Sequence, residues 1–196
     1  MVEMEMPGRM LREKGGRTWR IGTAADVAWI VQKTAPPGLS ITVAIPEQFA
    51  AYATIVVPRG ETARSTQAQV VMDILSRNTA GQPWWLGYLD TGDEDVVFPD
   101  VPQVKLYAGW SYVVVEAGPQ QASTWRSENG WFERGPVPDI VFPADRSWLL
   151  STLWDDDWRC FGGPGEVVAE LLREPSLVAR AVLPGEDATP PGHVAR

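Results

Sequence analysis

The sequence is poor in the residues that carry most enzyme chemistry. Its 196 residues include one Cys, Cys160, and one His, His193. A single Cys excludes an intrachain disulfide, and a single His argues against a His-based catalytic triad or a zinc site. No apolar run reaches the roughly 20 residues that cross a bilayer, and residues 1–16 lack the apolar block of a signal peptide. We therefore expect a cytoplasmic protein with no membrane contact.

Basic side chains are scarce in the second half of the chain. Residues 1–88 carry nine Lys or Arg and seven Asp or Glu, whereas residues 89–196 carry eight and eighteen, which gives the net charge of −8. Phosphate groups are bound by basic patches that displace counterions. The acidic balance therefore disfavours nucleic acid and anionic lipid, and it favours a basic protein as a partner.

Apolar and aromatic side chains are abundant. Apolar types make up 44% of the residues, and ten residues are Trp. A chain of this length buries roughly 70% of the surface that its unfolded form exposes, which is enough for one core. We expect a flexible leader over 1–16, a single globular domain over 17–183 and a polar tail over 184–196.

The first half alternates strands with helices. Apolar residues at helical spacing follow Thr23, a favourable N-cap, and the run ends at Pro36-Pro37-Gly38. A second apolar set at helical spacing predicts a helix over 66–78. The remaining predicted elements are strands over 18–22, 40–45 and 54–57 and a helical turn over 46–51.

From Trp84 onward the sequence is rich in strands. Seven short runs of β-branched and aromatic residues are separated by Pro and Gly. Two helices are predicted after Pro119 and Pro164, and a last strand over 178–183. These features predict an α+β fold in which helices pack on a mostly antiparallel, meandering sheet.

Two parts of the second half resemble each other. Val97-Phe98-Pro99 matches Val141-Phe142-Pro143 at an offset of 44, and Gly118-Pro119 matches Gly163-Pro164 at an offset of 45. We interpret this as an internal strand–strand–helix repeat over about 96–128 and 140–174, in which each Gly-Pro turns the chain off the sheet into a helix. The alternative is that two unrelated strand–turn–helix units have the same Gly-Pro turn by chance.

Two clusters of carboxylates are candidate sites. The first, Asp90–Asp95, could hold a hard cation, but its ligand order does not match an EF-hand loop. The second, Trp154–Trp158, places three Asp between two indoles, which is typical of a sugar-binding platform and also of a tight turn between strands. Because Asp favours turns and exposed loops, we predict no metal site and favour the turn.

The remaining candidates are Trp side chains and Cys160. Trp84 and Trp85 must point to opposite faces of a strand, so one of them is either exposed as a contact surface or covered by a second layer of helices. Cys160 lacks a His within the predicted domain to act as its base, so we interpret it as a small core residue. No catalytic residue is predicted. No glycine-rich segment matches a phosphate-binding loop, so no cofactor is predicted either.

Some segments resemble known groups of proteins. WWLGYLDTG, FPADRSWLLSTLWDDDW and GEDATPPGH are similar to uncharacterised globular proteins of high-GC actinobacteria, and this resemblance implies no activity. The general layout, with Ile45-Pro46-Glu47 ahead of a short helix, is also similar to the SUKH superfamily of toxin-immunity proteins. That similarity implies an acidic, cytosolic α+β domain that acts by binding a protein, and it assigns no functional residue.

Two functions remain open on the sequence. The first is a non-enzymatic cytosolic module, immunity- or regulator-like, that binds a protein through an acidic, Trp-rich surface. The alternative is a carboxylate-dependent enzyme such as a glycoside-active hydrolase, which would use one Asp from each acidic cluster. For the first function, the candidate binding residues are Trp84, Trp85, Asp93, Asp95, Trp110, Trp154, Asp155, Asp157 and Trp158.

Overall fold

A computed structural model describes residues 10–92, 96–128, 136–153 and 156–194. The strands are β1 (Leu11–Lys14), β2 (Arg17–Ile21), β3 (Ala51–Val56), β4 (Trp84–Leu89), β5 (Val104–Leu106), β6 (Trp110–Ala117), β7 (Ile140–Pro143), β8 (Leu149–Ser151), β9 (Trp158–Gly163) and β10 (Ala179–Ala181). The helices are α1 (Ala24–Val31), α2 (Glu61–Arg77), α3 (Pro119–Glu128) and α4 (Gly165–Arg173), with a 3₁₀ turn, η1 (Ile41–Val43). Within these ranges, no helix combines the length and apolar character that crossing a membrane requires.

The described strands form one sheet in which every pairing is antiparallel. Their order is β1-β2-β6-β4-β7-β8-β9-β3-β10, and β5 pairs with the start of β6. The consecutive strands β7, β8 and β9 form a meander at the centre, between the pair β6 and β4 and the pair β3 and β10. The predicted α+β fold with a mostly antiparallel sheet is confirmed.

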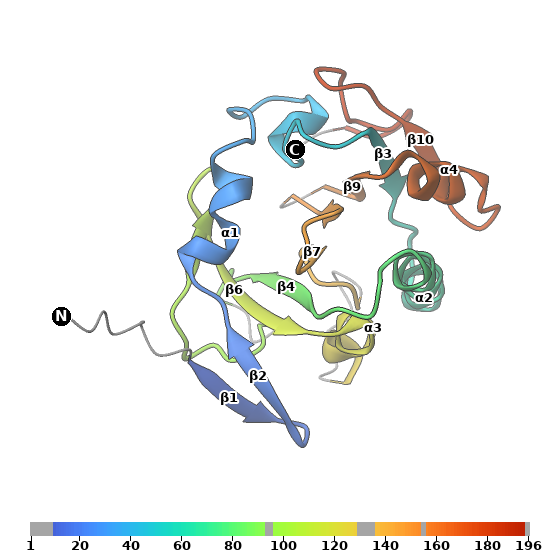
Figure 1. Ribbon diagram of the computed structural model, residues 1–196. Helices are drawn as coiled ribbons and strands as arrows, with labels where there is room; N and C mark the ends of the chain where they lie inside the picture. The colour runs from blue at the N-terminus through green and yellow to red at the C-terminus, as the bar shows by residue number, and fades with distance from the viewer. Residues whose placement is uncertain (1–9, 93–95, 129–135, 154–155, 195–196) are drawn as a thin grey trace.

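The two faces of the sheet are covered by different structures. Helices α2, α3 and α4 pack on one face, which we call the helical face, and α1 and η1 pack on the other, the cavity face (Figure 1). Strand side chains alternate between the faces, so every residue of β4 and β9 is buried. Trp84 joins the core of the helical face and Trp85 the core of the cavity face. Neither residue therefore offers the exposed contact surface that the sequence allowed.

The internal repeat is present in part. In both units a hairpin, β5–β6 or β8–β9, leads through a Gly-Pro pair into a helix, α3 or α4. Both helices pack on the helical face. The first strands differ, because residues 140–143 form β7 whereas residues 96–99 form no strand. Phe98 has a φ of 54°, a left-handed conformation that interrupts an extended chain.

Several segments differ from the sequence-based expectation. Residues 11–14 pair with β2 as β1 instead of forming part of a leader. The predicted strand over 40–45 is the turn η1, because Ile41 and Ile45 stand four residues apart and both pack on the cavity face. The predicted helical turn over 46–51 is a non-helical turn over residues 46–50, and Ala51 begins β3. Helix α2 begins at Glu61, earlier than expected, because its first turns are polar and carry no apolar spacing.

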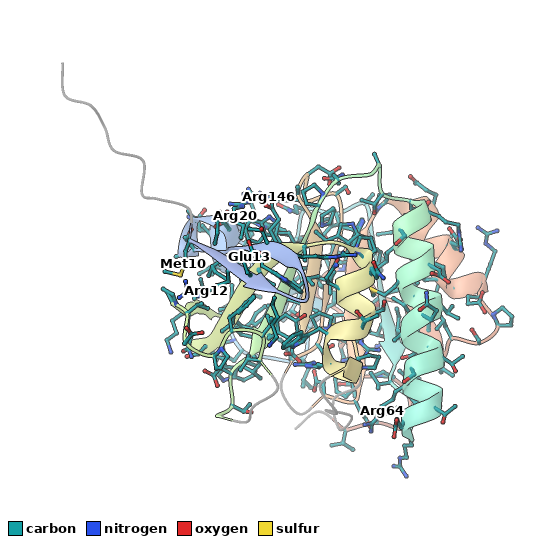
Figure 2. All side chains as sticks on the ribbon, turned by 90° about the horizontal axis from the view of Figure 1, so that it is seen from below. Met10, Arg12, Glu13, Arg20, Arg64 and Arg146 are labelled. Atoms are coloured by element: carbon teal, nitrogen blue, oxygen red, sulfur yellow. The ribbon has the colours of Figure 1, made fainter. Side chains whose placement is uncertain are left out.

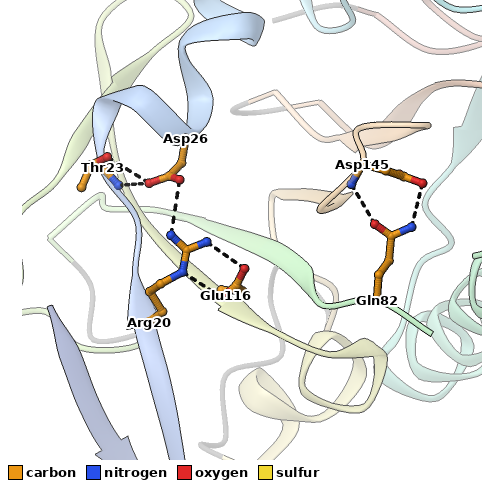
Figure 3. A network of polar contacts seen from close by, with 6 residues as sticks. All are labelled: Arg20, Thr23, Asp26, Gln82, Glu116 and Asp145. Carbon is orange, nitrogen blue, oxygen red and sulfur yellow. Dashed lines mark hydrogen bonds and ion pairs between the residues drawn. The ribbon is translucent and has the colours of Figure 1, made fainter. Parts of the chain in front are cut away.

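Polar contacts anchor α1 beside the sheet (Figure 3). The Asp26 carboxylate accepts hydrogen bonds from the backbone N–H and the hydroxyl of Thr23, at 2.8 and 2.9 Å, which confirms the predicted helix start. Arg20 on β2 donates to both carboxylate oxygens of Glu116 on β6 at 2.8 Å and lies 3.6 Å from Asp26. One guanidinium thus ties two strands to the first turn of the helix.

Charged groups are buried beneath the helices of the other face. Helices α2 and α3 stand side by side on this face (Figure 2). The Asp139 carboxylate accepts hydrogen bonds from Arg126 of α3 at 2.7 Å and from the Leu89 N–H at 2.8 Å. Arg159 donates to Gln67 of α2 at 2.9 Å, and burial lowers the pKa of Arg159 to about 10. These contacts join α2 and α3 to strands that they cover.

Candidate functional site

A cavity of about 520 Å³ lies on the cavity face of the sheet. Its walls come from the segment 31–44, the turn 107–110 between β5 and β6, the start of β9, and residues 188–189 near the C-terminus. This volume falls within the roughly 300–1,000 Å³ of sites for small molecules. Most of the lining is apolar and includes Val31 and Leu39, which are 48% and 54% exposed. The cavity therefore presents apolar surface that the fold itself leaves uncovered.

Trp110 is a partly exposed indole in the wall of this cavity. It begins β6, is half-buried, and lines the cavity together with Trp158 at the start of β9. The other Trp residues that the structure describes are at most 7% exposed: Trp19, Trp29, Trp84, Trp85, Trp125, Trp148 and Trp158. A half-buried indole in a concave site can cover a ligand without first being exposed by a conformational change.

The structure brings three of the nine predicted binding residues together. Trp110 and Trp158 line the cavity, and Asp157 follows the lining residue Asp156 directly. The structure places Trp84 and Trp85 in β4 within the two cores, away from this cluster. The remaining four predicted residues, Asp93, Asp95, Trp154 and Asp155, lie outside the described residues.

Tyr107 holds the turn that carries Trp110. Its φ is 48°, a left-handed conformation that is strained for a bulky side chain. Its hydroxyl donates to the Ala44 carbonyl oxygen at 3.1 Å and lies 2.8 Å from the Ser151 hydroxyl. Burial raises the pKa of Tyr107, so the hydroxyl keeps its proton and remains a donor. The two contacts fix the turn against η1 on one side and β8 on the other.

Cys160 lies in the cavity wall as a buried thiol. Burial, followed by the nearby Asp156 carboxylate, raises the pKa of this thiol to about 12. The thiolate, which is the reactive form, is therefore rare near neutral pH. Cys160 is 3% exposed and packs in the core of the cavity face, which confirms the interpretation as a core residue.

His193 reaches the acidic cluster, which the sequence analysis missed. Its Nδ1 lies 2.7 Å from Oδ1 of Asp157, and its ring packs edge-to-face on Trp158 at a centroid distance of 6.3 Å. Arg180 holds this segment in place by donating to the carbonyl oxygens of Asp187 and Thr189. No local sequence pattern predicts a contact between residues that are 36 positions apart. The predicted tail over 184–196 thus contributes one wall of the cavity.

Asp90 and Asp157, one from each acidic cluster, do not form the pair of carboxylates that a glycosidase needs. Asp90 follows β4 and Asp157 precedes β9, and strands β7 and β8 lie between these two. Three strand spacings of about 4.8 Å separate β4 from β9 by about 14 Å, whereas glycosidase carboxyl groups lie about 5–9.5 Å apart. Over the described ranges, no three His, Cys, Asp or Glu residues gather closely enough to hold a metal ion.

Comparisons with known proteins do not identify this site. The chain matches no protein-family model, no curated protein and no solved structure. The resemblances to actinobacterial proteins and to the SUKH superfamily therefore stay predictions. Function has to be argued from the cavity and its chemistry.

Proposed function

We propose that this protein is a cytoplasmic, non-enzymatic binding module that takes a small ligand, or one side chain of a protein ligand, into the cavity beside Trp110. The observation that carries the proposal is the placement of Trp110, the half-buried indole in the wall of a cavity of about 520 Å³. The immunity- or regulator-like role belongs to the same proposal, with a protein as the source of the bound group.

The apolar lining supports binding. Val31 and Leu39 are exposed at the cavity, and apolar surface gains free energy when a ligand removes it from water. Tyr107 and the C-terminal segment hold two of the walls through hydrogen bonds. A site whose walls are already held in place loses little conformational entropy when it binds.

The two buried titratable groups of the cavity, Cys160 and Tyr107, favour binding over catalysis. The Cys160 thiol stays protonated because burial raises the pKa to about 12. The Tyr107 hydroxyl also stays protonated and is engaged by Ala44 and Ser151. Neither group can act as a general base near neutral pH.

A fragment screen tests the proposal. Ligand-observed NMR with the full chain should detect fragments that bind, and Ala108→Phe should abolish their binding. Ala108 is an exposed residue of the cavity wall, so a phenyl ring there fills the cavity without disturbing the core. Ala25→Phe, at an exposed position of α1 outside the cavity, is the matched control and should leave binding unchanged.

Two outcomes would reject the proposal. If no fragment binds the wild-type protein, the cavity is not a ligand site. If fragments bind equally well to wild type and to Ala108→Phe, they bind elsewhere. Circular dichroism of both variants shows whether each retains the fold.

A further inference from the structure

We infer that the group bound in this cavity is an organic cation, such as a substituted ammonium or guanidinium, held against Trp110. The inference deepens the proposed function and rests on it. It is carried by the half-buried indole of Trp110 and the carboxylate of Asp156, which both line the cavity beside the more buried rings of Tyr107 and Trp158. An aromatic face attracts a cation through its quadrupole, and this attraction is strongest where water is excluded.

The charges at the cavity have the sign that a cation requires. Among the described residues that line it, Asp156 is charged and none is Lys, Arg or His. Two basic groups lie beside the wall. The Nδ1 of His193 is 2.7 Å from Asp157 and its ring packs on Trp158, and the guanidinium of Arg180 donates to the carbonyl oxygens of Asp187 and Thr189. The Asp156 carboxylate raises the pKa of Cys160 and Arg180 lowers it, and the effect of Asp156 is the larger.

The segment that follows α1 adds to this field. Val31 ends α1, and Thr34 and Ala35 line the cavity directly after it. The C-terminal end of a helix carries a partial negative charge because its last carbonyl groups lack intrahelical partners. Lys33, two residues after α1, directs its ammonium to Gln48 outside the lining, where it donates at 2.7 Å. The wall thus combines aromatic side chains with the Asp156 carboxylate and the end of a helix.

A pair of isosteric probes tests the inference. The hydroxyphenyl-trimethylammonium ion and tert-butylphenol have nearly the same shape and differ in charge. Isothermal titration calorimetry with the full chain should show the cation binding about tenfold more tightly. Trp110→Leu should reduce the preference for the cation several-fold, and Asp156→Asn, as a separate variant, should reduce it by a larger factor. The control Ala25→Phe should leave the preference unchanged.

The outcomes separate this inference from the proposed function. Equal or tighter binding of tert-butylphenol would overturn the inference, while its loss in Ala108→Phe would still support the cavity as a binding site. Failure of both probes would also overturn the inference, and the fragment screen decides the proposed function independently.

A basic peptide identifies the source of the cation. A decapeptide of alternating Lys and Gly that displaces the ammonium probe, in wild type but not in Trp110→Leu, assigns the cation to a protein side chain. Lack of displacement assigns it to a small molecule. Displacement that is equal in both proteins would show that the peptide binds another acidic surface and would overturn the assignment to a protein.

Discussion

The two faces of the sheet share the same strands but differ in how they are covered. The helical face lies beneath three regular helices, of which α2 has 17 residues. The cavity face lies beneath α1, with eight residues, the three-residue turn η1 and irregular segments. Regular helices present evenly spaced side chains that interlock with a sheet. Irregular segments lack this even spacing, so they cover a sheet less completely. The cavity therefore lies where the cover is irregular, and the predictions below test this difference.

The largest effect is expected where the helical face buries charge. Asp139→Asn should destabilise the fold by about 3–5 kcal/mol, because it removes the charge of a carboxylate that is paired with the buried Arg126 guanidinium. The matched control is Glu116→Gln on the half-buried pair with Arg20, which should lose about 1 kcal/mol or less. Denaturant unfolding measures both, and equal losses would show that burial does not set the strength of these pairs.

The next largest difference in stability is expected between Trp→Leu substitutions on the two faces. Trp148→Leu should destabilise by about 3 kcal/mol, because Trp148 is fully buried, packs edge-to-face on Trp84 at 4.9 Å and donates to Thr79. Trp110→Leu should lose about 1 kcal/mol or less, because Trp110 is only half-buried in the cavity wall. If thermal unfolding shows equal losses, the indole at 110 is structural.

Glycine sets how closely η1 approaches the sheet. A β-carbon at Gly162 would lie 2.6 Å from Cδ2 of Phe49 and closer still to Ile45. Gly162→Ala should therefore destabilise by about 1–3 kcal/mol and weaken ligand binding, because the segment that forms a cavity wall must move. Gly165→Ala is the control, since a β-carbon there meets nothing within 4 Å. A Gly162→Ala protein as stable as the control would show that the cover of the cavity face is pliable.

The smallest effect is expected at the C-terminal wall. His193→Gln should lose less than about 1 kcal/mol, because the side chain of its partner Asp157 is 55% exposed and such pairs are weak. Hydrogen exchange over residues 183–194 should nevertheless become faster, since the ring also packs on Trp158. Unchanged exchange would show that Arg180 and the backbone hydrogen bonds to Leu39 and Ile41 hold the segment without His193.

The fold class could be predicted because it depends on local patterns. Short apolar runs separated by Pro and Gly indicated the strands, and the Gly-Pro pairs marked the starts of α3 and α4. The segment 40–45 was misassigned because its β-branched residues favour a strand locally, whereas the packing of Ile41 and Ile45 favours a 3₁₀ turn. Strand β1 was missed because its mostly exposed residues carry no apolar pattern.

The candidate site could be predicted only in part. Trp110 and Trp158 were named because Trp and Asp are concentrated in the second half, and both line the cavity. Trp84 and Trp85 were named because neighbouring strand residues point to opposite faces, but a sheet covered on both faces buries both. The walls at 31–44 and 188–189 come from segments far apart in sequence, so no spacing rule could join them.

The sequence by itself determined the chemistry that is at hand: an acidic chain with many indoles, a single Cys and a single His. It also determined the alternation of apolar residues that places Trp84 and Trp85 on opposite faces. Only the tertiary structure decided that both faces are covered, that Trp110 remains half-buried, and that His193 returns to Asp157. The physical reason is that burial and cavities depend on contacts between distant segments, and local patterns do not specify which segments meet.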